Sequence, residues 1–447
     1  MSKAATLAFV VLGLGIAGSV VGLSISMANN FNKLESNIID GATSQSTSST
    51  SSASSTSTGQ ASSSSSSSSV VPSVPGVQVG PFTNVDGRPG ALDLSTYPAT
   101  EGLTYTYNDS DHTAVVARGN FAGDVLVIPA TVDKDGTIYN VTRVSSFIRM
   151  PQLKYVFIPK YVTRFGWSGD SYNHDTGAFF ADTGLIEIQF ASDSVLTELS
   201  YDYGGLFGDN EHEFRYDQFT YINIPDAVTY FDPESFRDVS GLTSFTFPSA
   251  INTIKANCFK YCTGLKSIVI PDSVTSMEDK LFEYCYSLQY IKIGTGVTSV
   301  GKYFFSHCWA LKTVILPDKI TELWDSCFND CQGLEEITLP ASLTCIRPAI
   351  FSGCVSLAHL YSPANAGQVY ELAFNNCISL KWVAFTKALD SIGSAAFKYV
   401  PATCNIYVTD GDTNDFNTDN NPNSCPIHTV GTWMMVDGVP TTQTTGA

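Results

Sequence analysis

A spacing of 23 residues governs the second half of this chain of 447 residues. The interval from Leu242 to Leu265 is 23 residues, and each later leucine of the series follows at the same interval. A phenylalanine column and a cysteine column keep the same period. Three columns with one period are typical of a repeat protein in which every repeat forms one coil of a stack. The columns are Leu242, Leu265, Leu288, Leu311, Leu334, Leu357 and Leu380; Phe236, Phe259, Phe282, Phe305, Phe328, Phe351, Phe374 and Phe397; and Cys262, Cys285, Cys308, Cys331, Cys354 and Cys377.

Each repeat has the pattern of one short strand that ends at a proline. Ile268 and Ile270 alternate with Ser267 and Val269, as in a strand with one buried face. Pro271 ends the strand because it has no N–H to donate. So short a segment cannot bury its own apolar side chains, but stacked coils share a continuous core. The sequence therefore predicts a mainly β fold, a solenoid whose strands pair in parallel about 4.8 Å apart.

The chain has 11 cysteines, for which we considered disulfides, a metal site and buried thiols. No Cys-x-x-Cys pair occurs, so the ligand spacing typical of zinc is absent. In-register residues on neighbouring coils project in parallel nearly 5 Å apart, whereas a disulfide needs its Cβ atoms about 3.8 Å apart. We therefore predict that the column cysteines are small buried thiols. For Cys404 and Cys425, near the end of the array, the sequence does not decide between a disulfide and two free thiols.

The consensus Leu-x-x-Ile-x-Ile-Pro-x-x-Val-x-x-Ile, followed by Ala-Phe-x-x-Cys-x-x-Leu, is matched closely over residues 265–285. With this pattern the chain resembles the BspA-like leucine-rich repeat family over about residues 103–408. The resemblance implies a leucine-rich-repeat solenoid over 129–408, preceded by a β-rich cap over 81–128. It also implies a surface protein of a bacterium or protist, used in adhesion or partner recognition. The family carries no catalytic motif, so the resemblance implies no active-site residues.

The first 26 residues predict a transmembrane anchor or a signal segment. Ala4–Ile25 carries no charge and is long enough to cross the hydrocarbon core of a bilayer. Ser26-Met27-Ala28 resembles the small-x-small cleavage site of a secretory signal, so cleavage is the alternative. Both alternatives place the rest of the chain across a membrane.

Three further segments lie outside the expected solenoid. Residues 27–43 have apolar residues at helical spacing, which predicts a juxtamembrane helix or a frayed end. Residues 44–80 are rich in Ser, Thr and Pro and lack the apolar side chains that would offset ordering, so they predict a disordered, flexible stalk. Residues 409–447 predict a polar C-terminal tail or cap.

Charge and motifs exclude several functions. Lys and Arg number 24 and Asp and Glu number 42, so the net charge is −18, which argues against a nucleic-acid partner. No nucleophile elbow, His-Glu-x-x-His motif or phosphate-binding loop occurs. We therefore predict that the protein is not an enzyme and has no catalytic residues, no metal site and no cofactor.

Two early coils are longer than the repeat, with insertions near 167–182 and 201–217. Insertions in a solenoid form loops on one face and often carry a binding site. Trp167 and Tyr203 are the candidate binding residues in these loops. The alternative is that the loops only cover a bend in the array.

The outward face of the predicted strands is a second candidate surface. The second and fourth residues after each repeat leucine point away from the core, from Ser267 and Val269 to Trp382 and Ala384. Exposed aromatic residues in a row indicate a contact surface, although strands favour such residues in any case. The candidates are Tyr290, Lys292, Ile315, His359, Tyr361 and Trp382.

These features favour a membrane-tethered or exported cell-surface protein whose solenoid mediates adhesion or recognises a macromolecule. The expected partner is a protein or a glycan at a cell or particle surface, with membrane contact through the N-terminal segment. The alternative is a structural spacer or coat component that stacks or self-associates without a specific ligand.

Overall fold

The structure is a computed structural model, and its described residues all lie in one compact unit, Pro75–Ala447. The predicted segments 1–26, 27–43 and 44–80 therefore lie outside the described residues. Within the part that the structure describes, no helix is both long enough and apolar enough to span a bilayer. The described residues are 92–442, except for 146, 148, 167–177, 180–183, 200–206, 208–215, 363–364, 410–415, 430–432 and 437–438.

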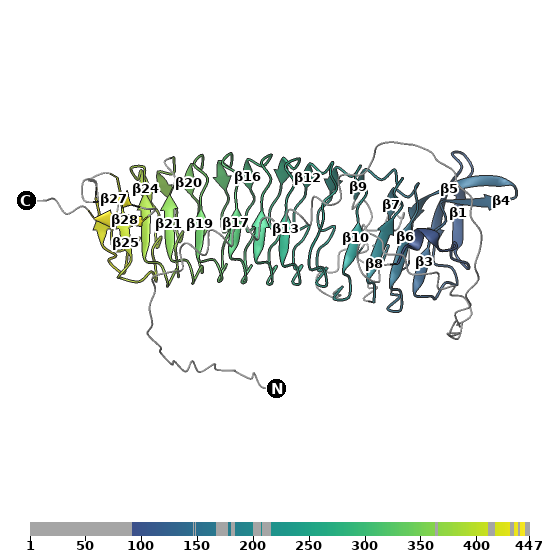
Figure 1. Ribbon diagram of the computed structural model, residues 1–447, viewed down its shortest axis with the longest axis horizontal. Helices are drawn as coiled ribbons and strands as arrows, with labels where there is room; N and C mark the ends of the chain where they lie inside the picture. The colour runs from purple at the N-terminus through teal and green to yellow at the C-terminus, as the bar shows by residue number, and fades with distance from the viewer. Residues whose placement is uncertain are drawn as a thin grey trace, which may run out of the picture. The chain divides into compact units, whose positions relative to one another are not determined.

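A ribbon with two antiparallel and two parallel strand pairs lies at one end of the coils (Figure 1). Its strand β2 pairs with β1 on one side in antiparallel fashion and with β5 on the other in parallel fashion. The ribbon follows the short 3₁₀ helix η2 (Leu94–Thr96), whose buried Leu94 donates its N–H to Gln189. The ribbon consists of β1 (Thr104–Asn108), β2 (Thr113–Ala117), β4 (Thr131–Lys134) and β5 (Thr137–Val144), with β7 (Arg164–Phe165) paired to β5.

The predicted strands form the first face of the coils, and they pair in parallel as expected. In β13 and β15, Ile268 lies opposite Ile291, which is 23 residues later. The coils follow one another in chain order along one axis (Figure 1). The strands of this first face are β3 (Val125–Val127), β6 (Tyr155–Ile158), β8 (Glu187–Phe190), β10 (Tyr221–Asn223), β13 (Ser267–Val269), β15 (Tyr290–Lys292), β17 (Thr313–Ile315), β19 (Glu336–Thr338), β21 (His359–Ser362), β23 (Trp382–Phe385), β25 (Asn405–Tyr407) and β26 (Ile427–His428).

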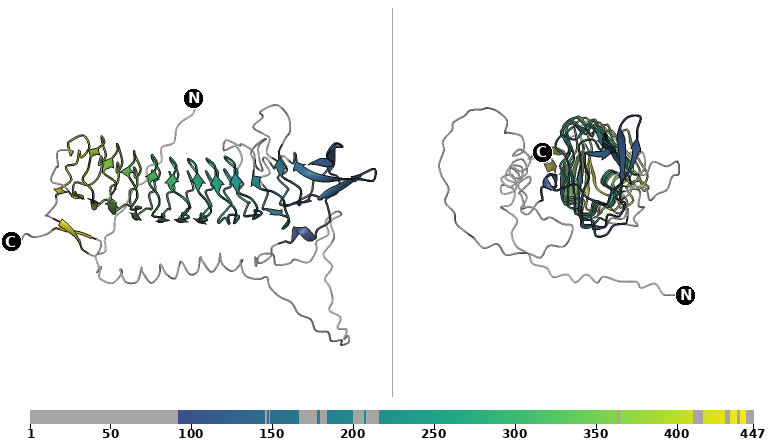
Figure 2. Two further views of the ribbon diagram at one scale, coloured as in Figure 1. Left: turned by 90° about the horizontal axis from the view of Figure 1, so that it is seen from above. Right: turned by 90° about the vertical axis from the view of Figure 1, so that its right-hand side faces the viewer.

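A second face of short parallel strands was not predicted from the sequence. Each strand has two residues; the first is exposed or half-buried except in β20, and the second is usually buried, as in β14 with exposed Ser276 and buried Met277. Figure 2 shows the coils from two further sides. The strands of this second face are β9 (Glu198–Leu199), β11 (Tyr230–Phe231), β12 (Thr253–Ile254), β14 (Ser276–Met277), β16 (Ser299–Val300), β18 (Glu322–Leu323), β20 (Cys345–Ile346), β22 (Gln368–Val369) and β24 (Ser391–Ile392). An antiparallel pair, β27 (Trp433–Val436) and β28 (Val439–Thr442), follows the coils.

A third side of each coil is made of turns that also bond to the next coil. The N–H groups of Lys280, Phe282 and Tyr284 donate to carbonyl oxygens of the following coil at 2.8–2.9 Å. Lys280 and Tyr284 have positive φ, 59° and 63°, while Phe282 between them does not. These hydrogen bonds tie the turn side of each coil to the next coil, as the parallel strands tie the two other faces.

The phenylalanine column is the centre of the core. Phe259, Phe282 and Phe305 are fully buried. Their rings stack with centroids 5.5 and 6.0 Å apart, and Phe328 continues the stack 5.2 Å from Phe305. The predicted ladder of like residues along the axis is therefore confirmed.

The six column cysteines are free and buried, as predicted. Each thiol donates to the carbonyl oxygen of a phenylalanine in the preceding coil, as Cys308 does to Phe282 at 3.2 Å. Burial raises the pKa of all six thiols. Cys404 and Cys425 are also free in the structure, and the Cys425 thiol donates to the carbonyl oxygen of Pro401 at 3.4 Å.

Candidate functional site

The candidate residues of the first face lie on its outward surface in two groups. In the first group Tyr290 lies opposite Thr313, and Lys292 lies opposite Ile315, on neighbouring parallel strands. Tyr290, Lys292 and Ile315 are all half-buried. Residues of a strand alternate between its two faces, so Tyr290 and Lys292 face outward because Ile291 between them is fully buried.

The second group is more aromatic. His359 on β21 lies opposite Trp382 on β23, with ring centroids 5.1 Å apart. Tyr361, two residues after His359, is 43% exposed. Burial lowers the pKa of His359 below its ordinary value, and the nearby Lys381 lowers it further, so the imidazole is neutral at neutral pH.

One member of the predicted outward row is not exposed. Ala384 is fully buried, although its position in the repeat faces away from the core. Its register neighbours are Tyr361 on one side and Tyr407 on the other. A methyl group between two large rings of adjacent strands is covered by them, so the prediction of exposure was wrong at this position.

Exposed polar residues separate the two groups. Glu336 and Thr338 on β19 lie between them and are both exposed. The surface is thus a row of aromatic and aliphatic side chains interrupted by one polar rung. Trp167 and Tyr203, the candidates in the two insertions, lie outside the described residues.

A pocket on the second face was missed by the sequence interpretation. It has a volume of about 360 Å³ and is lined by Glu278, Asp279, Ser299, Gly301, Lys302 and Trp324, among others. The signal was present in the sequence: the residue four before each core phenylalanine is large in the neighbouring coils but is glycine at 301. The glycine at 301 could not be interpreted as a pocket from the sequence, because the second face of strands was not predicted.

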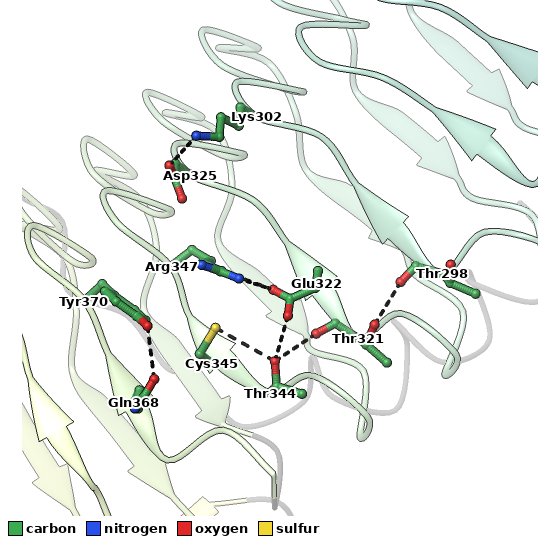
Figure 3. A network of polar contacts seen from close by, with 10 residues as sticks. All are labelled: Thr298, Lys302, Thr321, Glu322, Asp325, Thr344, Cys345, Arg347, Gln368 and Tyr370. Carbon is green, nitrogen blue, oxygen red and sulfur yellow. Dashed lines mark hydrogen bonds and ion pairs between the residues drawn. The ribbon is translucent and has the colours of Figure 1, made fainter.

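Polar contacts link the coils that follow the pocket (Figure 3). Lys302 forms an ion pair with Asp325 at 3.0 Å, and Arg347 donates to the Glu322 carboxylate from Nε at 3.1 Å and from Nη2 at 2.8 Å. The Arg347 guanidinium also lies 4.4 Å from the ring centroid of Trp324. These contacts hold one side of Trp324 in place.

No group of three or more His, Cys, Asp or Glu side chains in the described part of the chain lies in an arrangement that would hold a metal ion. The described surface carries an aromatic row on the first face and, on the second, a polar pocket lined on one side by the Trp324 indole.

Comparison with known proteins identifies the repeat. The family model described as the BspA type leucine rich repeat region matches residues 210–335 and 298–419, with six copies. No curated protein compared with the chain matches it.

Several solved structures are similar. A leucine rich cell surface protein from Faecalibacterium prausnitzii is 20% identical, with a TM-score of 0.37, over 75% of this chain and 96% of the other. A leucine-rich repeat protein from Bacteroides ovatus is 19% identical, with a TM-score of 0.42, over 74% and 99%. The pneumococcal vaccine antigen PcpA is 16% identical, with a TM-score of 0.39, over 74% and 98%. The resemblance found in the sequence is confirmed by the family model: the repeat region of this chain is a BspA-type leucine-rich repeat array.

Proposed function

We propose that the protein is a recognition or adhesion protein of the cell surface and that the outward face of β13–β23 binds a partner macromolecule. The observation that carries the proposal is the aromatic group of His359, Tyr361 and Trp382, which adjacent parallel strands hold in register. Rings fixed by a stacked backbone lose little conformational freedom when a partner covers them, and such rings dominate binding energies.

The charge of the chain supports a protein or glycan partner. The net charge of −18 repels polyanions, which argues against electrostatic attraction to nucleic acid as the driving term of binding. The interruption at Glu336 and Thr338 favours two contact areas on one extended partner over a single deep contact.

The test is capture of binding partners by the full chain and by two matched variants. In the first variant Tyr290, Tyr361 and Trp382 are changed to Ser. In the second, exposed aromatic residues away from the strand face are changed to Ser: Tyr303, Trp309 and Tyr399, which are 40%, 45% and 59% exposed. A partner that the wild type and the second variant capture, and the first variant loses, supports the proposal. A partner that all three capture equally assigns binding elsewhere, and no reproducible partner favours the spacer role.

Tethering to a membrane is the second part of the proposal. Its support is the charge-free stretch Ala4–Ile25, long enough to cross a bilayer. N-terminal sequencing of the native protein tests it. A native chain that still carries Ala4–Ile25 and partitions with membranes supports an anchor, whereas a chain that begins after Ala28 is an exported protein without one.

A further inference from the structure

The pocket on the second face exists because one rung of a side-chain column is missing. The residue four before each core phenylalanine points along this face: Lys255 and Glu278 form an ion pair at 2.5 Å, and two coils later Trp324 packs against Arg347. Gly301, between these pairs, has no side chain to contribute. The column therefore has a gap one coil thick, about 4.8 Å along the axis, between the Glu278 carboxylate and the Trp324 indole.

The chain itself cannot fill this gap. A Cβ placed on Gly301 would lie 2.7 Å from the carbonyl oxygen of Glu278 and 2.8 Å from Oδ1 of Asp279. The backbone of the coil is thus drawn against the preceding one, and only glycine fits there. The floor of the pocket is fixed by backbone packing.

The indole of Trp324 forms one wall. Arg347 lies 4.4 Å from its ring centroid, and the Arg347 guanidinium lies 5.8 Å from the ring of Tyr370 in the next coil. Towards Gly301 the column offers no side chain, and Trp324 is one of the residues that line the pocket there. A π-face carries partial negative charge and attracts positively polarised C–H groups as well as cations.

The polar side chains that line the pocket favour an uncharged ligand over an anion or a cation. Glu278 and the exposed Asp279 present carboxylate oxygens, which oppose an anion. The Lys302 ammonium, held by Asp325, lies 5.9 Å from the Trp324 ring centroid and opposes a second cation. A hydroxyl group both donates and accepts, so it can bond to the carboxylates, to the Ser299 hydroxyl and to the ammonium without a charge conflict. The volume, about 360 Å³, lies at the small end of ligand sites.

We propose that this pocket binds one uncharged pyranose ring of a glycan, with its C–H face on Trp324 and its hydroxyl groups on Glu278, Asp279 and Lys302. The inference deepens the recognition role proposed above and rests on it, since it names the chemical class of one partner. It assigns that partner to the second face of the coils, whereas the aromatic row lies on the first.

The test measures binding of small probes to the full chain. Saturation-transfer NMR detects which probes bind, and titration gives their affinities. The probes are the methyl glycosides of glucose, galactose, mannose and N-acetylglucosamine, with methyl glucuronide as the anion and N-acetylarginine amide as the cation. At least one neutral glycoside is expected to bind saturably. Trp324→Leu, which keeps an apolar side chain beside Arg347, should weaken that binding on the order of tenfold. The matched control Trp309→Leu changes an exposed tryptophan outside the pocket and should leave the affinity unchanged.

A second variant protects the test against loss of folding. Asp279→Asn keeps the oxygen that accepts the backbone N–H of Lys302 at 2.8 Å, and it should weaken glycoside binding about fivefold because the ligand loses a charged acceptor. The proposal is overturned if no neutral glycoside binds, if both variants bind as the wild type does, or if only the arginine amide or the glucuronide binds. The strand-face variant of Tyr290, Tyr361 and Trp382 should keep glycoside binding, so failure of the pocket and failure of the aromatic row give different results.

Discussion

The core phenylalanines occupy the same position in every coil, where each ring is buried and stacks on the rings of the neighbouring coils. Phe305 is fully buried and contacts the rings of Phe282, Phe304 and Phe328. We predict that Phe305→Ala lowers the free energy of unfolding by about 3–5 kcal/mol, because the neighbouring coils cannot close the cavity. Ile378→Ala, at a position that is 54% exposed, should change it by less than about 0.5 kcal/mol. Urea denaturation measures both, and equal effects would contradict the buried ladder.

Half-buried tyrosines set an upper pH limit on the stability of the fold. Burial raises the pKa of Tyr105, Tyr230 and Tyr261 to about 12, above the value near 10 of an unfolded chain. Above pH of about 10 the unfolded state therefore releases these protons more readily than the folded state, and stability falls as pH rises. This contribution is complete below pH of about 10 and is lost by about 12.

Tyr261→Phe isolates one of these groups. The variant should lose stability less steeply than the wild type as pH rises from about 10 to about 12, because it has one fewer raised pKa. Urea midpoints measured at several pH values give both slopes. An unchanged slope would show that the phenol of Tyr261 ionises as readily in the folded protein as in the unfolded chain.

Burial at the column positions could be predicted from spacing, whereas backbone angles could not. Leu288, Phe305 and Cys308 are buried because their period places them inward. Tyr303 and Ala349, by contrast, have φ of 53° and 51°, and neither residue type indicates a left-handed conformation. The bonding of the coils imposes those angles, and a single sequence holds no local signal for them.

At the scale of elements, the turn side of each coil stores strain that glycine would relieve. Ala349 holds a left-handed angle, in which the Cβ of an L-residue is crowded. We predict that Ala349→Gly raises the free energy of unfolding by about 0.5–1 kcal/mol, although glycine in ordered segments usually destabilises. Ala310→Gly, at a residue without positive φ, should lower it by about the same amount. Thermal unfolding distinguishes the two signs, and a loss of stability in both variants would contradict the assigned turn geometry.

The first face of strands was predictable and the second was not, for a physical reason. Alternation across Ser267–Ile270 is long enough to be recognised, and Pro271 marks its end. The strands of the second face have two residues each, as in Ser299–Val300, too few to show a period of two. The pocket at Gly301 was missed with them. Ala384 was assigned correctly to a strand but wrongly to the exposed surface, because its neighbours in the sheet decide its exposure.

At the scale of the whole molecule, the repeated coil determines both the fold and the arrangement of the exposed side chains. Parallel pairing repeats the same register from Ile268 through Ile291 to Val314, so whatever one coil exposes lies directly above the same position of the next. Rows of side chains, and gaps such as that at Gly301, follow from this repetition. A chain built in this way gains a binding surface by changing side chains without altering its fold.

Deletion of one coil tests most directly whether the fold is built from stacked 23-residue coils. Removal of residues 311–333, one complete period, joins the coil of Leu288 to that of Leu334 in register. That variant should unfold in one cooperative thermal transition, with a far-ultraviolet circular dichroism spectrum like that of the wild type. Removal of residues 311–322 alone should abolish the transition, because the leucine, phenylalanine and cysteine columns beyond the deletion lose their register. Equal stability of the two variants, or loss of folding in both, would contradict a fold built from stacked 23-residue coils.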